Sequence, residues 1–168
     1  RLLRHSSNGG NKEVHSSPMR VALVSDWLVT FGGAEHVIVE FLKLFPGSPL
    51  FTTVCDRGAV GPLRDVEIQT SSLQRLYRIT RNHRILAPFM PKAIESLDLR
   101  GFDIVLSSSH AIAKGCLPMS RALHLCYCHT PMRYAWLMEK QYLQDFGLRG
   151  PLRKIARKNL MRLRRFDL

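Results

Sequence analysis

The chain has 168 residues, of which 45% are hydrophobic, and a formal net charge of +12. This is enough for one domain with a hydrophobic core, and no apolar run approaches the roughly 20 residues that span a bilayer. The positive charge indicates attraction to anionic lipid, nucleic acid or phosphorylated ligands, without selecting among them. Residues 1–18 are polar, rich in glycine and serine, and lack the apolar core of a secretory signal. We expect 1–18 to be a disordered leader or a non-native extension that precedes a natural start at Met19.

Residues 20–45 predict a buried strand, a glycine loop and an amphipathic helix. The strand at 21–24 is short, apolar and β-rich. Gly32 and Gly33 follow, and glycine allows positive φ and close approach to the backbone. The predicted helix has one apolar face, which consists of Val37, Ile38, Phe41, Leu42 and Phe45. A glycine turn at a helix N-terminus can bind phosphate, so the glycine pair is a candidate site; a tight loop that needs positive φ is the alternative.

The remaining elements alternate between strands and helices. Strands are predicted at 49–54, 66–70, 102–107 and 123–128, with a polar loop at 108–115. The helical stretch 72–97 should divide into two helices near Pro88 and Pro91, because proline disrupts a helix interior. The alternation predicts an α/β fold, a Rossmann-like parallel sheet with helices on both faces, over residues 19–150. Ligands bind beyond the carboxyl ends of such strands, so the loops after Val24, Leu106 and Cys128 should line one edge.

A basic amphipathic helix is predicted at 151–168, where apolar residues recur at helical spacing between arginines and lysines. The apolar positions are Leu152, Ile155, Ala156, Leu160 and Leu163. Such a helix lies either on an anionic membrane surface or against its own domain, and the sequence leaves both readings open.

The four cysteines indicate a reduced setting, because no secretory signal accompanies them. Cys126 and Cys128 share one face of a predicted strand, with His124 and His129 nearby. A zinc site is the alternative to buried structural thiols, which we favour because the second pair of ligands is missing.

Three sequence strings together resemble a known family. The chain has no G-x-G-x-x-G fingerprint and no G-x-x-x-x-G-K-[ST] phosphate loop. The strings SDWLVTFGGAE, FDIVLSSSHAIAKG and YCHTPMRYAW occur in this order. They resemble the amino-terminal half of retaining GT-B-fold glycosyltransferases of family 4 (group 1), in the mannosyltransferase-like branch. The resemblance covers residues 19–168, and the CHTPMRYAW string is its most specific part.

The resemblance implies roles for seven residues at an interdomain cleft. His129 is the implied catalytic residue, which would hydrogen-bond a hydroxyl of the donor sugar. The implied donor- or acceptor-binding residues are Gly32, Gly33, Ser109, His110, Lys114 and Arg133. The guanidinium of Arg133 suits a phosphate. Asp26 either caps its loop or binds ligand, and His110 has an equally good structural role in a serine-rich turn.

The function that the resemblance implies is transfer of a hexose, with mannose as the candidate, to a lipid-linked or polysaccharide acceptor. The co-substrate would be a nucleotide-sugar donor, without a further cofactor or a metal. The protein would be cytoplasmic, held at the inner membrane face by the helix at 151–168, with no specific nucleic acid partner. Such enzymes carry a second Rossmann-like domain with an E-x7-E motif, which we expect to be absent from this chain, so that the chain alone is inactive.

Two other classes remain open. One is a non-catalytic basic binding module for nucleic acid or anionic membrane, although the basic residues are not interleaved with aromatics in a recognition motif. The other is a Rossmann-type enzyme of different chemistry, which tight NAD(P) binding would reveal.

Overall fold

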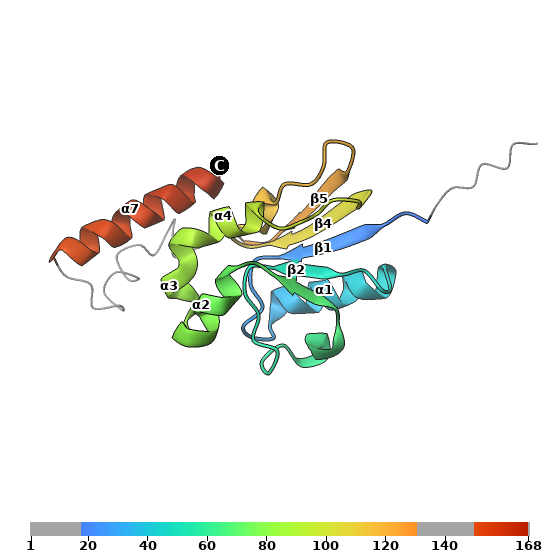
Figure 1. Cartoon of the computed structure of the whole chain (residues 1–168), viewed down its shortest axis with the longest axis horizontal. Helices are drawn as coiled ribbons and strands as arrows, with labels where there is room; N and C mark the ends of the chain where they lie inside the picture. The colour runs from blue at the N-terminus through green and yellow to red at the C-terminus, as the bar shows by residue number, and fades with distance from the viewer. Residues whose placement is uncertain (1–17, 131–149, 168) are drawn as a thin grey trace, which may run out of the picture.

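The computed structural model describes residues 18–130 and 150–167, and it contains a five-stranded, all-parallel sheet with helices on both faces (Figure 1). The strands lie in the order β3-β2-β1-β4-β5. They are β1 (Val21–Ser25), β2 (Leu50–Thr52), β3 (Ile68–Thr70), β4 (Ile104–Ser109) and β5 (Leu123–Cys128). The α-helices are α1 (Gly33–Leu44), α2 (Leu73–Thr80), α3 (His83–Leu86), α4 (Met90–Glu95) and α7 (Gly150–Asp167). Short 3-10 helices are η1 (Gly61–Asp65), η2 (Ala87–Phe89) and η3 (Ala113–Gly115). The predicted α/β Rossmann-like fold is confirmed.

The central strand β1 divides the hydrophobic core into two parts. All five of its residues are buried. Ala22 and Val24 belong to a cluster with apolar residues of α2–α4 and α7, whereas Val21 and Leu23 belong to a cluster that α1 covers. Successive side chains of a strand point to opposite faces, so an apolar run such as VALV needs cover on both sides. The sequence of β1 therefore requires helices on both faces.

Helix α1 packs with the face that its periodicity predicts. Ile38 is fully buried, and Phe41, Leu42 and Phe45 pack against the same cluster. The N–H of Phe45 donates to the carbonyl of Phe41 at 2.8 Å, which closes the last turn. Gly47 then adopts φ 78°, a left-handed conformation that glycine accepts at little cost, and the chain turns into β2.

The helical stretch after β3 is interrupted at two places, of which one was predicted. Arg81 has φ 50° and ends α2, and the side chain of Asn82 accepts the N–H of Arg84 to start α3. Pro88 and Pro91 each occupy the first turn of a short helix, where the missing N–H has no helical partner. The predicted division near these prolines is therefore confirmed, since α3 ends at Leu86 and α4 begins at Met90, whereas the earlier break at Arg81 and Asn82 was not predicted.

Strand β4 extends two residues beyond its predicted end, since Ser108 and Ser109 pair with Tyr127 and Cys128 of β5. Its three serines are buried, although 108–115 was predicted to be a polar loop. Buried hydroxyls need partners, and those of Ser107 and Ser108 hydrogen-bond imidazoles. The strands β2 and β3 are shorter than predicted, at three residues each.

Helix α7 packs against its own domain. Leu160 and Leu163 are buried in the cluster on the α2–α4 face of the sheet. Phe166 lies so close to Gly115 that a β-carbon at this glycine would overlap its ring. Of the two readings of this helix, the structure supports packing for its apolar side. No helix in the described ranges is long and apolar enough to cross a membrane.

Candidate functional site

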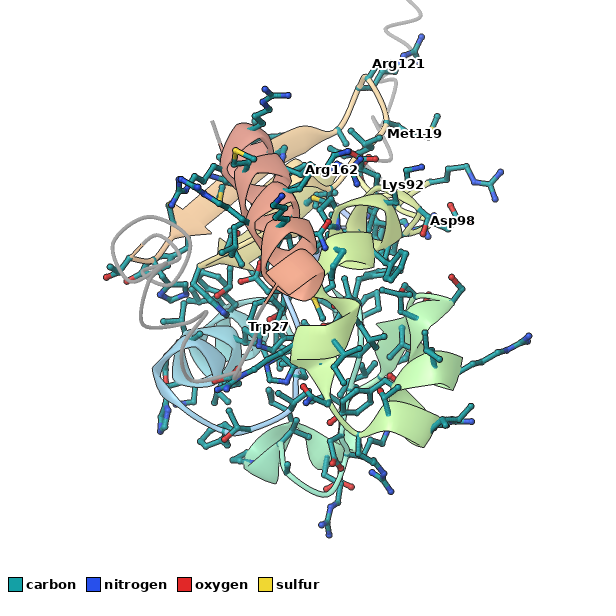
Figure 2. All side chains as sticks on the ribbon, turned by 90° about the vertical axis from the view of Figure 1, so that its left-hand side faces the viewer. Trp27, Lys92, Asp98, Met119, Arg121 and Arg162 are labelled. Atoms are coloured by element: carbon teal, nitrogen blue, oxygen red, sulfur yellow. The ribbon has the colours of Figure 1, made fainter. Side chains whose placement is uncertain are left out.

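The polar residues predicted for a site converge where the strand order reverses. β1 lies between β2 and β4, and Ser25 pairs with Ser108 at the carboxyl ends of β1 and β4. In an open parallel sheet this switch point leaves a crevice in which ligands bind. Figure 2 faces this edge of the sheet and shows Trp27, which follows Asp26 directly after β1.

Asp26 organises the loop that follows β4. Its side chain is fully buried, and its two carboxylate oxygens accept the backbone N–H groups of residues 110–113 at 2.6–3.2 Å. The hydroxyl of Ser109 donates to the same carboxylate at 3.3 Å. Four amides that converge on one carboxylate form a concave anion site, which the chain occupies with its own side chain. The open question about Asp26 is therefore answered: it caps this loop.

His110 forms an ion pair with Asp26, with 2.8 Å between Nδ1 and Oδ2. Burial opposes ionisation of both groups, but the hydrogen bond and the opposite charge outweigh it. The pKa of Asp26 is therefore lowered and that of His110 is raised, the latter with a further contribution from Glu35. The pair at the switch point therefore favours its charged form, with a carboxylate beside a protonated imidazole.

His129 follows β5, and its pKa is shifted in the opposite direction. Its backbone N–H donates to the carbonyl of Ser109 at 2.8 Å, and its Nε2 hydrogen-bonds the Ser108 hydroxyl at 2.8 Å. Burial, and then the positive charge of His110, lower the pKa of His129. The site therefore combines two imidazoles whose pKa values are shifted in opposite directions, upward for His110 and downward for His129.

Trp27 and His83 complete this edge of the sheet. The Trp27 ring contacts His110 edge-on, with ring centroids 4.8 Å apart, and it contacts His83 of α3 at 5.3 Å. Burial and the neighbouring positive charges lower the pKa of His83. Sequence reasoning missed both residues. The rule of strand ends could have found Trp27, because it lies just beyond β1, but His83 has no such local signal.

The glycine pair lies at the start of α1. A need for positive φ was one predicted reason for these glycines, and the structure does not show it. Gly32 has φ −144°, and neither glycine is among those with positive φ. The N–H of Gly32 donates to the carboxylate of Glu35 at 2.9 Å, which buries Glu35 in the first turn. A β-carbon at Gly33 would meet no described atom within 4 Å. The described structure does not require this glycine, and the space beside it is open to a ligand.

The structure thus brings together most of the predicted site residues. Ser109, His110 and His129 are joined by hydrogen bonds through Asp26 and the end of β4. Glu35 acts electrostatically on both histidines, which ties the start of α1 to the same site. Lys114 follows the capped loop in η3 and is half-buried. Arg133 lies outside the described residues.

The cysteines are divided between interior and surface. Cys55 and Cys116 are buried, whereas Cys126 and Cys128 are exposed, so the prediction of buried thiols is wrong for the second pair. Their strand β5 is at the edge of the described sheet, where one flank has no neighbouring strand. His124 Nε2 lies 3.5 Å from Cys116 Sγ, but no cluster of three metal-binding side chains occurs in the described part of the chain.

A hollow of about 400 Å³ is lined by the segments that precede β4 and β5, at the edge of the sheet opposite to the carboxyl ends of the strands. Its lining residues are Ser96, Leu97, Asp98, Leu99, Arg100, Leu117, Pro118 and Met119. None of the predicted site residues borders it, so it is not the candidate site.

The fold and this edge define a Rossmann-like α/β domain with a polar site at its switch point. Comparisons with family models, with curated proteins and with solved structures found no significant match to this chain. The function must therefore be argued from the residues themselves.

Proposed function

We propose that this chain is the acceptor-side domain of a nucleotide-sugar-dependent retaining glycosyltransferase. The observation that carries the proposal is the convergence of His110, His129 and the open glycine start of α1 on one switch point. The family resemblance of the three sequence strings makes the same prediction, with a hexose such as mannose as the transferred sugar.

The geometry suits the parts of this reaction that an acceptor-side domain performs. A neutral His129 offers hydrogen bonds to a sugar hydroxyl. The raised pKa of His110 favours its protonated form, which suits negative charge such as that on the leaving diphosphate. Asp26 holds the 110–113 loop in place, so these groups need little rearrangement when substrate binds.

Transfer also requires groups that hold the nucleotide. The resemblance assigns them to a second Rossmann-like domain with the E-x7-E motif, outside these 168 residues. We therefore propose that this chain binds donor weakly and does not transfer sugar by itself. The acceptor is a lipid-linked or polysaccharide intermediate, and the protein acts at the inner membrane face.

The test is a titration of the ¹⁵N-labelled chain with GDP-mannose, UDP-glucose and NADPH, observed at the imidazole nitrogens. We expect a sugar nucleotide at millimolar concentration to shift the signals of His110 and His129. His124 is the internal control, since it lies within β5, just before His129, and hydrogen-bonds Ser107 as His129 hydrogen-bonds Ser108. His129→Ala should weaken the response and His124→Ala should not.

The same titration can refute the proposal. A preference for NADPH over both sugar nucleotides would favour the alternative redox enzyme. Unchanged His110 and His129 signals at millimolar sugar nucleotide would remove this edge as the donor site.

A further inference from the structure

The helices beside the site expose an unusual number of large apolar side chains. Ile79 of α2 is 81% exposed, Ile85 of α3 is 58% exposed and Phe89 of η2 is 57% exposed. These three elements follow one another in the chain, and α2 contacts α3, which contacts η2. Ile79, Ile85 and Phe89 thus lie on elements that pack on one another, and exposed apolar side chains that gather in this way indicate an interaction surface.

Basic residues surround these apolar side chains. Arg75, Arg78 and Lys92 are exposed, and residues 72–94 contain no aspartate or glutamate. A surface that combines aliphatic and aromatic side chains with positive charge can bind a partner through both the hydrophobic effect and electrostatic attraction. It suits a partner that is anionic outside and apolar beneath.

Helix α7 extends this surface. Its inward side chains Leu160 and Leu163 are buried, and it contacts η2. The outward side carries exposed basic residues at helical spacing, namely Lys154, Arg157, Lys158, Arg162 and Arg165. Figure 1 shows α7 at the same end of the molecule as α2, α3 and α4. We call the exposed side chains of α2, α3, η2 and the outward side of α7 the basic apolar surface.

This surface borders the candidate site. His83 of α3 contacts Trp27 at the switch point, and Ile85, two residues further on, is exposed. The helix that contributes to the site edge therefore also contributes to the basic apolar surface.

We propose that the basic apolar surface binds an anionic lipid bilayer, so that the site edge opens beside the lipid headgroups. Ile79, Ile85 and Phe89 enter the headgroup region, and the basic side chains contact anionic lipid. Helix α7 contributes charge through its exposed basic residues, because its leucines at 160 and 163 are buried in the domain. Bulky aliphatic side chains at the centre of the surface favour lipid over nucleic acid, which is bound through phosphate contacts and aromatic stacking.

This orientation names the acceptor class. If the site opens beside the bilayer, the acceptor is an amphiphile whose polar head reaches the switch point while its tail stays in the membrane. This part of the inference rests on the proposed glycosyltransferase function, whereas membrane binding itself does not.

The first experiment measures binding of the full chain to vesicles of phosphatidylcholine with and without phosphatidylglycerol. The charge variant is Lys158→Gln/Arg162→Gln/Arg165→Gln, and the apolar variant is Ile79→Ser/Ile85→Ser/Phe89→Ser. The matched control is Leu44→Ser/Leu117→Ser/Met119→Ser, which removes three apolar side chains of similar exposure (70%, 63% and 53%) from other parts of the surface. All the substituted side chains are exposed, and far-UV circular dichroism verifies that each variant is folded.

We expect the wild-type chain to bind only the anionic vesicles, and less tightly as salt rises. The charge variant should lose on the order of 100-fold in affinity, at about fivefold per basic residue. The apolar variant should lose at least about tenfold, and the control should stay within about twofold. Equal losses in the apolar variant and the control, or tighter binding to a short DNA duplex than to anionic vesicles, would overturn the surface.

A second experiment tests the orientation of the site. Trp136→Phe leaves Trp27 as the single tryptophan of the chain. Brominated lipid in anionic vesicles should quench Trp27 fluorescence if the site edge faces the membrane, and unquenched emission from the bound chain would refute the acceptor class. Vesicle binding without a histidine response to sugar nucleotides would support the membrane-binding surface and refute the proposed function. A histidine response without vesicle binding would support the proposed function and refute the membrane-binding surface.

Discussion

Asp26→Asn tests whether one buried carboxylate holds the site together. Asparagine keeps the shape but replaces one acceptor oxygen by an NH₂ group, which can only donate. Each carboxylate oxygen accepts at least two backbone N–H groups in the structure. In either orientation of the asparagine amide, its NH₂ group would therefore face N–H donors in place of an acceptor. The variant also leaves the imidazolium of His110 beside a neutral group.

The expected loss is large for a single isosteric change. Breaking a buried ion pair from one side costs about 3–5 kcal/mol, and net hydrogen bonds to a charged group contribute about 1.5–3 kcal/mol each. Because His110 can lose its proton in the variant, we expect about 3–5 kcal/mol in total rather than the sum. For a domain of this size that corresponds to a melting temperature lower by roughly 6–20 °C.

Urea denaturation at pH 7, followed by far-UV circular dichroism, measures this loss. The control is Asp103→Asn, which alters an exposed carboxylate with one backbone partner, the N–H of Arg20, and should cost less than about 1 kcal/mol. A loss in Asp26→Asn no greater than that of the control would refute the role of Asp26. The double variant Asp26→Asn/His110→Gln should cost less than the two single changes added, because the two residues interact directly.

Three further predictions concern titration, packing and the glycine loop. The pKa of His110 is raised in the folded state, so its stabilising contribution is present below about pH 6.5 and is lost as pH rises through the folded pKa. As pH rises above about 6.5 the free energy of unfolding should therefore fall, and His110→Gln should remove this fall; the histidines with lowered pKa act at lower pH. Gly115→Ala should cost about 1–3 kcal/mol and make α7 more sensitive to protease, since the new methyl group overlaps Phe166; unchanged proteolysis would contradict this packing. Gly33→Ala should raise stability by up to about 1 kcal/mol because the site is open and helical, yet weaken the response to sugar nucleotides; a loss of stability would show that the glycine is structural.

Much of the candidate site was predictable because parallel strands align their carboxyl ends. Knowing only that His110 and His129 follow two such strands places them at one edge. The same rule pointed to Asp26 and left its role open, because a carboxylate after a strand can bind either a ligand or its own chain. The hydrogen bonds from the backbone amides of the loop to Asp26 join residues that are 84 to 87 positions apart in the chain. No local sequence pattern reveals which amides bond this carboxylate.

The burial of polar groups was the least predictable part. Ser108 and Ser109 look like loop residues, yet they extend β4, because His129 and Asp26 satisfy their hydroxyls in the interior. Glu35 looks like an exposed first-turn residue, but its bond to the N–H of Gly32 keeps it buried. Polarity alone does not show whether a partner is available, since the partner comes from another element.

The sequence by itself determined the alternation of strands and helices, the need to cover both faces of β1, and the edge at which polar residues collect. These follow from side-chain periodicity and from strand direction, which are local properties of the chain. Only the tertiary structure decided that Asp26 serves the loop, that the pKa values of His110 and His129 shift in opposite directions, and that α7 buries Leu160 and Leu163. Each of these depends on contacts between segments far apart in the chain, where burial and the identity of the partner set the outcome.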